Sequence, residues 1–350
     1  MLVGAAHAHL RVVAQLARAP LPDAEVHWVT RGEHASYSGL LSGWVAGEYP
    51  RSACTVALRP LAEAARVQLH TGGAVGLDAG RGAVALADGE TLTADVLSLG
   101  IGSALRGAEL PGVQAHALDI KRLLDDFERF PRVAGPWAVV GAGLGGIELA
   151  LCLRGVAEDV TLVAEGEAFP PGASQALVRV VQRVLDSRRV QRVHAAAVGL
   201  TGDAVALADG SRRAATGVLW ATGPAPHPLL AEAGLALGPT GAVSVGASLQ
   251  STSHPHVFAA GDCADLPMPA AKSGVYSVRE APVLGHNLLA ALRGQPLRAY
   301  RPQRRALALL NCGDGTALLS WGAYAARGRL LRSWKHRLDV AFLTSLRPVP

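Results

Sequence analysis

The sequence predicts an α/β protein built from two related layered domains and a short C-terminal α+β region. Three observations predict this fold class: a composition typical of a packed globular protein, an internal repeat, and a glycine-rich turn between a predicted strand and a predicted helix. Half of the 350 residues are hydrophobic and 40 are glycine, so we expect many tight turns between buried elements.

Composition also excludes several classes of function. The net charge is +5, but Lys and Arg are scattered outside a denser C-terminal stretch and form no stripe with interleaved aromatic residues, so we expect no nucleic-acid partner. No uncharged apolar run reaches the roughly 18 to 20 residues that cross a bilayer, and no signal peptide is recognisable, so we expect a cytoplasmic protein. The cysteines have no spacing suited to a redox disulfide or to zinc, so we expect no metal site; they are Cys54, Cys152, Cys263 and Cys312.

The internal repeat defines the two domains. "AVGLDAGRGAVALADGETLTADVLSLGIG" at residues 74–102 returns as "AVGLTGDAVALADGSRRAATGVLWATG" at residues 197–223. Each copy reads as a strand, a turn, a second strand "AVALADG", a polar stretch and a hydrophobic strand that runs into glycine, at Gly100 and Gly223. Two copies of one domain are therefore expected.

A complete dinucleotide fingerprint precedes the second copy. In "WAVVGAGLGGIELALCL" a predicted strand at 137–140 runs into the pattern G-x-G-x-x-G, and a helix follows. Glu165 ends the next strand about 20 residues downstream, where an acidic group binds a ribose. This context favours a nucleotide site over a glycine-tolerant turn in an ordinary parallel sheet. The predicted contacts in the turn are Gly141, Gly143, Leu144, Gly145 and Gly146.

The first domain has only a degenerate fingerprint. In "LVGAAHAHL" Gly4 is present, but Ala6 and His9 replace the second and third glycines. The repeat places this turn at the same point of the fold, so we expect it to hold a nucleotide as well. His7 and His9 then lie near a cofactor phosphate, although turn histidines with internal partners are the more common case.

A third signal is the stretch "VFAAGDCAD". A short strand at 257–260 ends in Gly261 and Asp262, which suits a carboxylate aimed at a polyol. Because Gly-Asp is also a common turn, the spacing alone leaves both interpretations open.

Together these segments resemble the glutathione-reductase-like flavoproteins of the pyridine nucleotide-disulfide oxidoreductase superfamily, over nearly the whole chain. The resemblance implies an α/β protein with two Rossmann-like, glutathione-reductase-type domains, small antiparallel β-meanders and a short C-terminal α+β region. It implies that the first fingerprint binds FAD, that the central one binds NAD(P)H, and that Asp262 binds the flavin ribitol. The implied limits are 1–112 and 229–295 for the FAD domain, 113–228 for the NAD(P)H domain and 296–350 for a C-terminal interface region.

A closer resemblance is to the NADH-dehydrogenase-like flavoproteins found beside, or fused to, selenide, water dikinase. It rests on "VGAAHAHL", "HASYSGLLSGWVAGEY", the terminal "WKHRLD" and, above all, "GVYSVREAPVLGHNLLAALRGQPLRAYRPQRRALALLNCGDGTALLSWG". It implies an FAD-dependent NAD(P)H dehydrogenase with a quinone or small oxidant as acceptor. It also implies selenide, water dikinase as a partner. A homodimer is a further expectation. The alternative function is a flavin-binding partner or redox sensor of the dikinase with little turnover.

Two departures from the family limit what carries over. The redox Cys-x-x-x-x-Cys is absent, so disulfide reduction is not expected. Thr30 and Arg31 stand where an acidic residue often ends the second FAD-domain strand, so weaker groups must hold the adenosine ribose. At the other site, Glu165 with no arginine directly after it favours NADH over NADPH.

The resemblance also supplies the candidate catalytic residues, Glu148 and Lys272. Glu148 matches a family glutamate near the nicotinamide and flavin, but a carboxylate favoured by the helix dipole fits equally well. The helix after the Gly-Asp strand points its positive end at the flavin pyrimidine edge in the family, which places Lys272 there. Its neighbours in this turn are Ser273, Gly274 and Val275. Tyr37 and Ser38 would line the acceptor side, or simply pack.

The C-terminal "RLLRSWKHRLDVAFL" reads as a basic amphipathic helix. One apolar stripe is predicted, consisting of Leu331, Trp334, Leu338 and Phe342, with most cationic residues elsewhere. Such a helix suits peripheral contact with an anionic membrane, where a quinone is accessible. Docking on its own chain or on a partner subunit is the slightly favoured alternative.

Overall fold

Two parallel five-stranded sheets organise the protein. The computed structural model describes residues 1–121, 123–124, 135–268 and 272–347. The first sheet has the order β21-β9-β1-β2-β5, with every pair parallel. Its strands are β1 (Leu2–Val3), β2 (His27–Val29), β5 (Gln68–His70), β9 (Leu97–Leu99) and β21 (Val257–Ala259).

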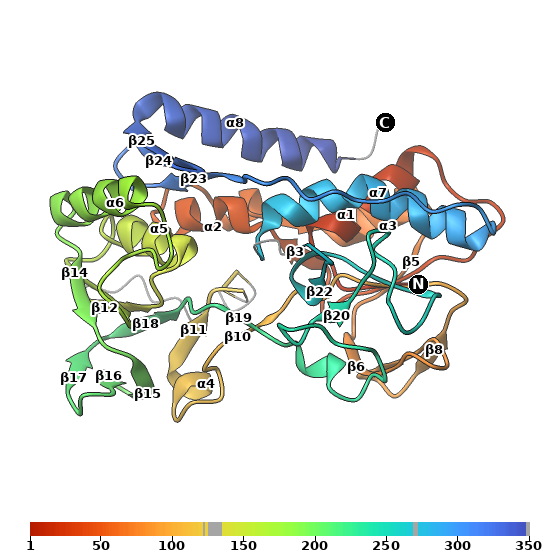
Figure 1. The fold of residues 1–350 in the computed structure, drawn as a ribbon, viewed down its shortest axis with the longest axis horizontal. Coiled ribbons are helices and arrows are strands. Elements are labelled where there is room, and N and C mark those ends of the chain that lie inside the picture. The colour runs from red at the N-terminus through yellow and green to blue at the C-terminus, as the bar shows by residue number, and fades with distance from the viewer. Residues whose placement is uncertain (122, 125–134, 269–271, 348–350) are drawn as a thin grey trace.

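Three helices pack together beside the first sheet. They are α1 (His7–Arg18), α3 (Leu58–Ala65) and α7 (Gly274–Leu292). The helix α1 contacts both α3 and α7, and in Figure 1 all three lie below α8 and above the labels of β5 and β6. Helix α1 buries an i, i+3, i+4 stripe that includes Leu10, Val13 and Ala14, which is the spacing that predicts an amphipathic helix.

The second sheet repeats this design. Its order is β11-β18-β12-β13-β14, again all parallel. Its strands are β11 (Ala117–Asp119), β12 (Pro136–Val140), β13 (Asp159–Ala164), β14 (Gln191–His194) and β18 (Gly217–Trp220). Residues 137–140 are all buried, as expected for a parallel strand covered on both faces. Helices α5 (Leu144–Leu153) and α6 (Gln175–Ser187) follow β12 and β13, and the Ser174 hydroxyl caps α6 by accepting the Leu177 N–H at 3.3 Å.

The repeated sequence forms two matching antiparallel sheets. The first consists of β6 (Ala74–Asp78), β7 (Ala83–Leu86) and β8 (Thr91–Thr93), and the second of β15 (Ala197–Thr201), β16 (Ala204–Leu207) and β17 (Arg212–Ala214). Both first strands carry an irregularity at the same point, between Ala74 and Gly76 and between Ala197 and Gly199. The predicted α/β class with small meanders is therefore confirmed. The domain limits stay a prediction.

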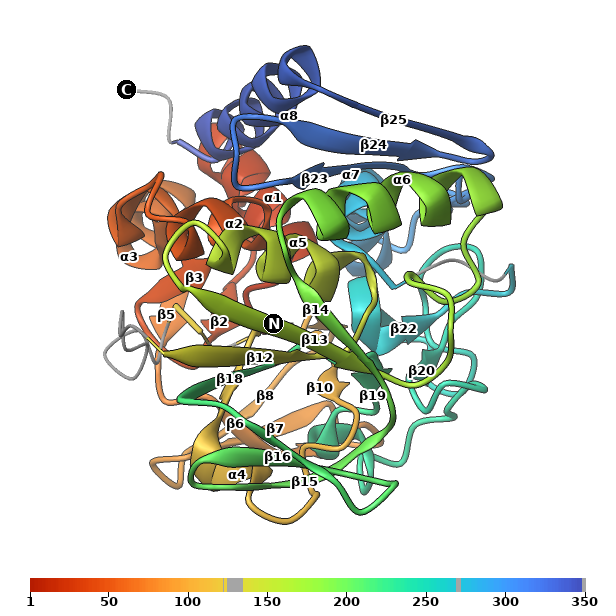
Figure 2. The ribbon, with the colours of Figure 1, turned by 90° about the vertical axis from the view of Figure 1, so that its left-hand side faces the viewer.

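The C-terminal region lies over helices of both halves. An antiparallel sheet of β23 (Leu307–Asn311), β24 (Ala317–Trp321) and β25 (Tyr324–Gly328) leads into α8 (Arg329–Ser345). Figure 2 shows this region above α2 (Ser38–Val45), α5 and α6, with the second parallel sheet below them. The largest hydrophobic cluster joins Leu284 of α7, Ile147 of α5 and Phe342 of α8, so the C-terminal region shares the main core.

Short elements connect these layers. The two-residue strands β10 and β19 pair antiparallel next to the second sheet, and β20 pairs with β22 beside the first. The short strands are β3 (His34–Ser36), β4 (Thr55–Ala57), β10 (Ala104–Leu105), β19 (Pro224–Ala225), β20 (Val243–Ser244) and β22 (Ala264–Asp265). The short helices are α4 (Val113–His116) and the 3₁₀ turns Arg51–Ala53, Pro228–Leu230 and Gly261–Cys263.

Two substitutions at the start of α5 test how tightly the second fingerprint is packed. A Cβ atom on Gly146 would lie 1.9 Å from the Gly141 carbonyl oxygen, whereas a Cβ on Gly145 meets no atom of the described residues within 4 Å. We expect Gly146→Ala to lower the free energy of unfolding by about 1–3 kcal/mol through overpacking. The matched control Gly145→Ala should be neutral or stabilise the helix slightly. Urea unfolding of both variants measures the difference, and equal midpoints would contradict the packing described here.

Candidate functional site

The carboxyl ends of the first sheet bring together most residues predicted for the first nucleotide. Gly4, Gly100 and Gly261 follow β1, β9 and β21, and parallel strands place such ends at one edge of the sheet. The helices α1 and α7 both begin here, because a Cβ on Gly274 would lie 3.5 Å from the His7 ring. The predicted turn residues therefore meet at the start of two helices.

The turn after β1 keeps glycine only where backbone packing demands it. Gly4 has φ +93°, and a Cβ there would lie 2.3 Å from the Gly100 carbonyl oxygen. The Ala6 N–H donates to that same oxygen at 3.2 Å. Ala6 is the N-cap of α1 and its own side chain makes no capping hydrogen bond, while the Ser277 hydroxyl accepts the Ala8 N–H of the first turn at 3.2 Å. The small residue at position 6 leaves the helix N-terminus accessible to an anion.

His9 corrects one expectation. Its ring is buried, with Nδ1 2.8 Å from the Gly4 carbonyl oxygen and Nε2 2.8 Å from Ser98 Oγ. Burial lowers the pKa of His9 to about 4, so the ring is neutral. A Cβ on Gly100 would lie 2.7 Å from this ring. The imidazole is thus a core residue accommodated by a glycine on the neighbouring strand, and both of its ring nitrogens are engaged by the chain itself, so neither is free to bind a phosphate.

His7 belongs to an aromatic cluster with residues distant in sequence. Its ring centroid lies 5.5 Å from that of Tyr37 and 5.4 Å from that of Phe342, and the last two rings stack at 4.8 Å. Burial lowers the pKa of His7 to about 4, with Asp262 acting in the opposite direction. Tyr37, at the start of α2, is buried, whereas the following Ser38 is exposed. Tyr37 therefore faces the first site from the side of α8.

Asp262 has partners that the sequence did not reveal. Its Oδ2 accepts from Ser103 Oγ at 3.4 Å and lies 3.3 Å from Lys121 Nζ. Lys121 lies just after β11, in a segment without a recognisable motif, so only the fold identifies it. Its ammonium group stands at the carboxylate predicted to bind a polyol.

A second unexpected contact involves Arg31. Its Nη2 lies 3.2 Å from Nε2 of His227, which belongs to the segment that returns from the second sheet. Burial lowers the pKa of His227 to about 4, and the charges of Arg31 and Lys121 act in the same direction. Thr30 is buried and donates to the Gly32 carbonyl oxygen at 2.8 Å, so it does not reach outward. Arg31, Lys121 and a neutral His227 thus share one region, and this donor set suits the phosphates of a dinucleotide.

The second sheet presents its own turn at its carboxyl edge. Gly141 has φ +112°, and no atom of the described residues lies within 4 Å of a Cβ on Gly143. Gly143 is the N-cap of α5 and Leu144 its first residue, without a side-chain cap from the residues that the structure describes. Glu165 is exposed directly after β13, and Gly223 follows β18 nearby. Open backbone at a helix N-terminus fits a pyrophosphate.

Lys272 is engaged in a salt bridge. Its Nζ lies 2.8 Å from Asp265 Oδ1 and also donates to the Ala264 carbonyl oxygen. Ser273 occupies the N-cap position of α7, and its side chain makes no capping hydrogen bond. Val275 is exposed in the first turn. The ammonium group thus pairs with β22, and the expected place of Lys272 at the flavin pyrimidine edge stays a prediction.

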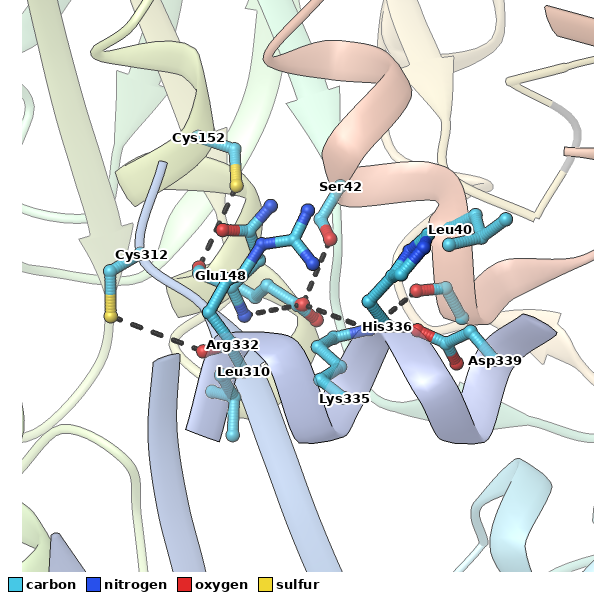
Figure 3. A network of polar contacts seen from close by, with 12 residues as sticks. Leu40, Ser42, Glu148, Cys152, Leu310, Cys312, Arg332, Lys335, His336 and Asp339 are labelled. Carbon is cyan, nitrogen blue, oxygen red and sulfur yellow. Dashed lines mark hydrogen bonds and ion pairs between the residues drawn. The ribbon is translucent and has the colours of Figure 1, made fainter. Parts of the chain in front are cut away.

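Glu148 lies at a junction of the first half, the second half and the C-terminal region (Figure 3). Its Oε1 accepts from Ser42 Oγ of α2 at 2.8 Å and from the Asn311 N–H of β23 at 2.7 Å. Lys335 of α8 approaches the same oxygen at 3.7 Å. The nicotinamide role expected for Glu148 must therefore compete with internal partners.

Lys335 links this junction to Tyr37. Its Nζ donates to the Gly39 carbonyl oxygen at 2.5 Å and to Asp339 Oδ2 at 3.0 Å, and Tyr37 Oη donates to Asp339 Oδ1 at 2.9 Å. Although burial opposes it, the carboxylates of Glu148 and Asp339 raise the pKa of Lys335. Burial, aided by Asp339, raises the pKa of Tyr37, so the phenol stays protonated. We call Glu148, Lys335, Asp339 and Tyr37 the junction network.

The orientation of α8 differs from the predicted single stripe. Its inner face carries Lys335, Asp339 and Phe342, all buried. Trp334 and Leu338 point outward, with 42% and 47% of their surface exposed. Charges face inward and large apolar groups face outward because the junction network pairs the inner charges. Such a local conflict is typical of functional sites.

Comparison with protein families matches residues 1–281 to the family described as "Pyridine nucleotide-disulphide oxidoreductase". The chain belongs to this family. The resemblance to the pyridine nucleotide-disulfide oxidoreductase superfamily is thereby confirmed, and with it the binding of FAD and NAD(P)H by the chain.

Individual relatives are distant. "NADH dehydrogenase-like protein YutJ" of Bacillus subtilis is 21% identical over 76% of this chain and 77% of its own. The sulfide:quinone oxidoreductase of Aquifex aeolicus has a TM-score of 0.78 at 16% identity, covering 99% of this chain and 90% of its own. NDH2 of Plasmodium falciparum in complex with NADH has a TM-score of 0.73 at 12% identity, covering 99% and 96%. These two structures establish the shared fold.

The cysteines of the chain lie in its core. All four cysteines are buried free thiols. Burial raises the pKa of Cys54, Cys263 and Cys312 to about 11, so these thiols are poor nucleophiles at neutral pH. The residues that the structure describes contain no group of three or more His, Cys, Asp or Glu able to hold a metal ion. Of the helices in the described ranges, none is long and apolar enough to cross a membrane.

The junction network yields a stability prediction. Lys335→Met leaves the buried Asp339 carboxylate and the half-buried Glu148 carboxylate without their cation, and we expect a loss of about 3–5 kcal/mol in the free energy of unfolding. Because the pKa of Lys335 is raised, its contribution is fully present below the ordinary lysine pKa, so the loss should stay constant from about pH 6 to about pH 9. Urea unfolding measures it, with the exposed Arg337→Met as the matched control. A loss no larger than that of the control would contradict the arrangement.

Proposed function

We propose that this protein is an FAD-dependent NAD(P)H dehydrogenase that works without a redox-active disulfide and passes electrons to a quinone or small oxidant. The observation that carries the proposal is the pair of nucleotide-type turns, Gly4–Ala6 and Gly141–Gly146, each at the carboxyl edge of its own parallel sheet. As part of the proposal, 1–112 and 229–295 form the FAD domain and 113–228 the NAD(P)H domain.

Residues of the first site fit FAD. The open N-terminus of α1 suits its pyrophosphate, Asp262 its ribitol, and Arg31 and Lys121 its negative charge. FAD, when bound, accepts two electrons from NAD(P)H and returns them to an acceptor. The protein's own residues bind and orient both dinucleotides, and buried thiols take no part.

NADH is the donor that the second site favours. Glu165 is exposed after β13, where a carboxylate binds the ribose hydroxyls and repels a 2′-phosphate. The residues directly after it, Gly166 to Pro171, include no Lys or Arg that would bind such a phosphate. A relative described as NADH dehydrogenase-like supports the same donor.

The outer face of α8 supports a lipophilic acceptor at a membrane surface. Leu330, Trp334 and Leu338 are exposed on it, Leu330 to 86%. Arg329 and Arg337 are exposed beside them, and the single acidic residue of α8, Asp339, points inward. An apolar and cationic face suits anionic lipid, so we propose a cytoplasmic protein that docks peripherally, where quinone is accessible.

A second candidate is a flavin-binding partner of selenide, water dikinase, or a redox sensor, with little turnover and a homodimeric state. The internal partners of Glu148 and Lys272 favour it, because they compete with a nicotinamide for Glu148 and with a flavin for Lys272. The two candidates differ in one measurable step, reduction of the bound flavin by NADH.

An anaerobic visible spectrum before and after adding NADH, and separately NADPH, tests the main proposal. We expect an oxidised flavin spectrum that bleaches faster with NADH. A yellow protein that NADH does not bleach would favour the binding partner. A colourless protein that FAD cannot reconstitute would refute both candidates.

Substitutions at each site should separate the two half-functions. Asp262→Ala removes the ribitol contact, and we expect at least about tenfold weaker FAD retention on desalting.

Gly143→Val should leave the protein yellow but abolish bleaching by NADH, because a branched side chain enters the open space where a pyrophosphate approaches. Gly202→Val, between β15 and β16, is the control, because a Cβ there comes no closer than 3.9 Å to any described atom. Undiminished bleaching in Gly143→Val would overturn the assignment of the second site.

Membrane docking has its own test. The double substitution Trp334→Ser with Leu338→Ser should reduce co-sedimentation with phosphatidylglycerol vesicles by at least about tenfold, because each buried apolar side chain contributes about 1.5–3 kcal/mol. Val75→Ser, on an exposed apolar residue of β6, is the matched control. If wild type and double variant sediment alike, α8 does not dock on lipid.

A further inference from the structure

Helix α7 carries two buried polar residues on the face turned towards the first site. Ser277 and Glu280 are 4% and 2% exposed, and their spacing of three places them one above the other on the helix. Their neighbours on the buried face of α7 include Ala281 and Leu284. Asn287, one turn past Leu284, is a third buried polar residue of α7, and all three require an explanation because burying polar groups is unfavourable without partners.

Each of these residues accepts a backbone N–H from a different turn. Ser277 Oγ accepts the Ala8 N–H, in the first turn of α1, at 3.2 Å. Glu280 Oε2 accepts the Gly261 N–H, directly before Asp262, at 2.6 Å. One helix face therefore holds both turns that approach the first dinucleotide, one beside its phosphates and one carrying the ribitol carboxylate.

The packing leaves little room for either turn to move. Gly261 has φ +75°, and a Cβ there would lie 3.1 Å from Ser277 Oγ. The two contacts are thus adjacent, and a shift of one turn disturbs the other. Because a carboxylate–amide bond is charge-assisted, it is stronger than a neutral one and fixes the Gly261 backbone firmly.

The environment of Glu280 explains how a carboxylate is tolerated here. Burial raises its pKa, while the Gly261 N–H and the Lys272 ammonium act to lower it and Asp262 acts to raise it. Tyr300 also faces Glu280, whose charge contributes to the raised pKa of that phenol. A leucine would be the simpler occupant of this position, so the acid is retained at an energetic disadvantage, as is common at functional sites.

We infer that Ser277 and Glu280 are positioning residues for FAD: together they fix the spacing between the α1 turn and the Asp262 carboxylate. The inference rests on the proposed function for the identity of the ligand. The two hydrogen bonds that Ser277 and Glu280 accept, which we call the brace, belong to the chain alone. Removing either acceptor should loosen one turn and weaken FAD binding without removing any group that touches the cofactor.

FAD titration of the apoprotein tests this. Glu280→Leu leaves the Gly261 N–H without its acceptor, and we expect a Kd for FAD at least about tenfold higher. Glu280→Gln keeps an oxygen acceptor of the same size and should bind FAD within about threefold of wild type. Arg279→Gln, exposed on the same helix, is the control. Equal affinities for Glu280→Leu and the control would overturn the inference, as would equal losses in the Leu and Gln variants.

The pH dependence gives a readout that a merely structural role would not move. Protonation of Glu280 removes the charge from its bond to Gly261, so FAD affinity of the wild type should fall on going from about pH 7 to about pH 5 more steeply than that of Glu280→Gln. Asp262, Lys272 and Tyr300 face the site in both proteins, so the difference isolates Glu280. Parallel pH profiles would count against the charge-assisted brace.

Hydrogen exchange of the apoprotein separates this inference from the proposed function. Glu280→Leu should speed exchange at Gly261, and Ser277→Ala at Ala8, each by at least about tenfold, while amides of β12 stay unchanged. If the wild type binds no FAD, the proposed function fails and these amides alone decide whether the brace exists. If Glu280→Leu does not fold, Ser277→Ala and the pH profile of Glu280→Gln decide it. Unchanged exchange at both amides would refute the brace.

Discussion

The close approach of a glycine to the end of a neighbouring strand is the contact on which the rest of the molecule depends. A Cβ on Gly4 would lie 2.3 Å from the Gly100 carbonyl oxygen, and a Cβ on Gly141 would lie 2.4 Å from that of Ala221. In both halves this contact lets the chain turn directly from the first strand into a helix. The helix N-terminus then stands over the carboxyl edge of the sheet, where a phosphate is stabilised by backbone N–H groups.

The C-terminal region turns two nucleotide-binding halves into one site. Its strand β23 and helix α8 contribute Asn311 and Lys335 to Glu148 of the second half, and Asp339 receives the hydroxyl of Tyr37 from the first. The charged side chains at this junction are largely shielded from solvent, and their contacts link three segments of the chain. The junction between the two halves is therefore shaped by residues that belong to neither dinucleotide-binding motif.

Local patterns in the sequence predict the repeated architecture well, because a strand, a glycine turn and a helix are encoded within about 20 consecutive residues. The partners of the site residues are not local. Nothing near Lys121 indicates that it meets Asp262, and nothing near Lys272 indicates its salt bridge with Asp265. His9 breaks the fingerprint in sequence, yet Gly100 on a distant strand accommodates its ring. Helical periodicity also misplaced Trp334, since buried ion pairs override the usual rule that charges face solvent.

The matching irregularities in the two small antiparallel sheets have an evolutionary consequence. A bulge changes the facing of every residue beyond it, so two independent sheets would rarely acquire one at the same point. The shared offset after Ala74 and Ala197 indicates that both halves descend from one duplicated ancestral gene segment.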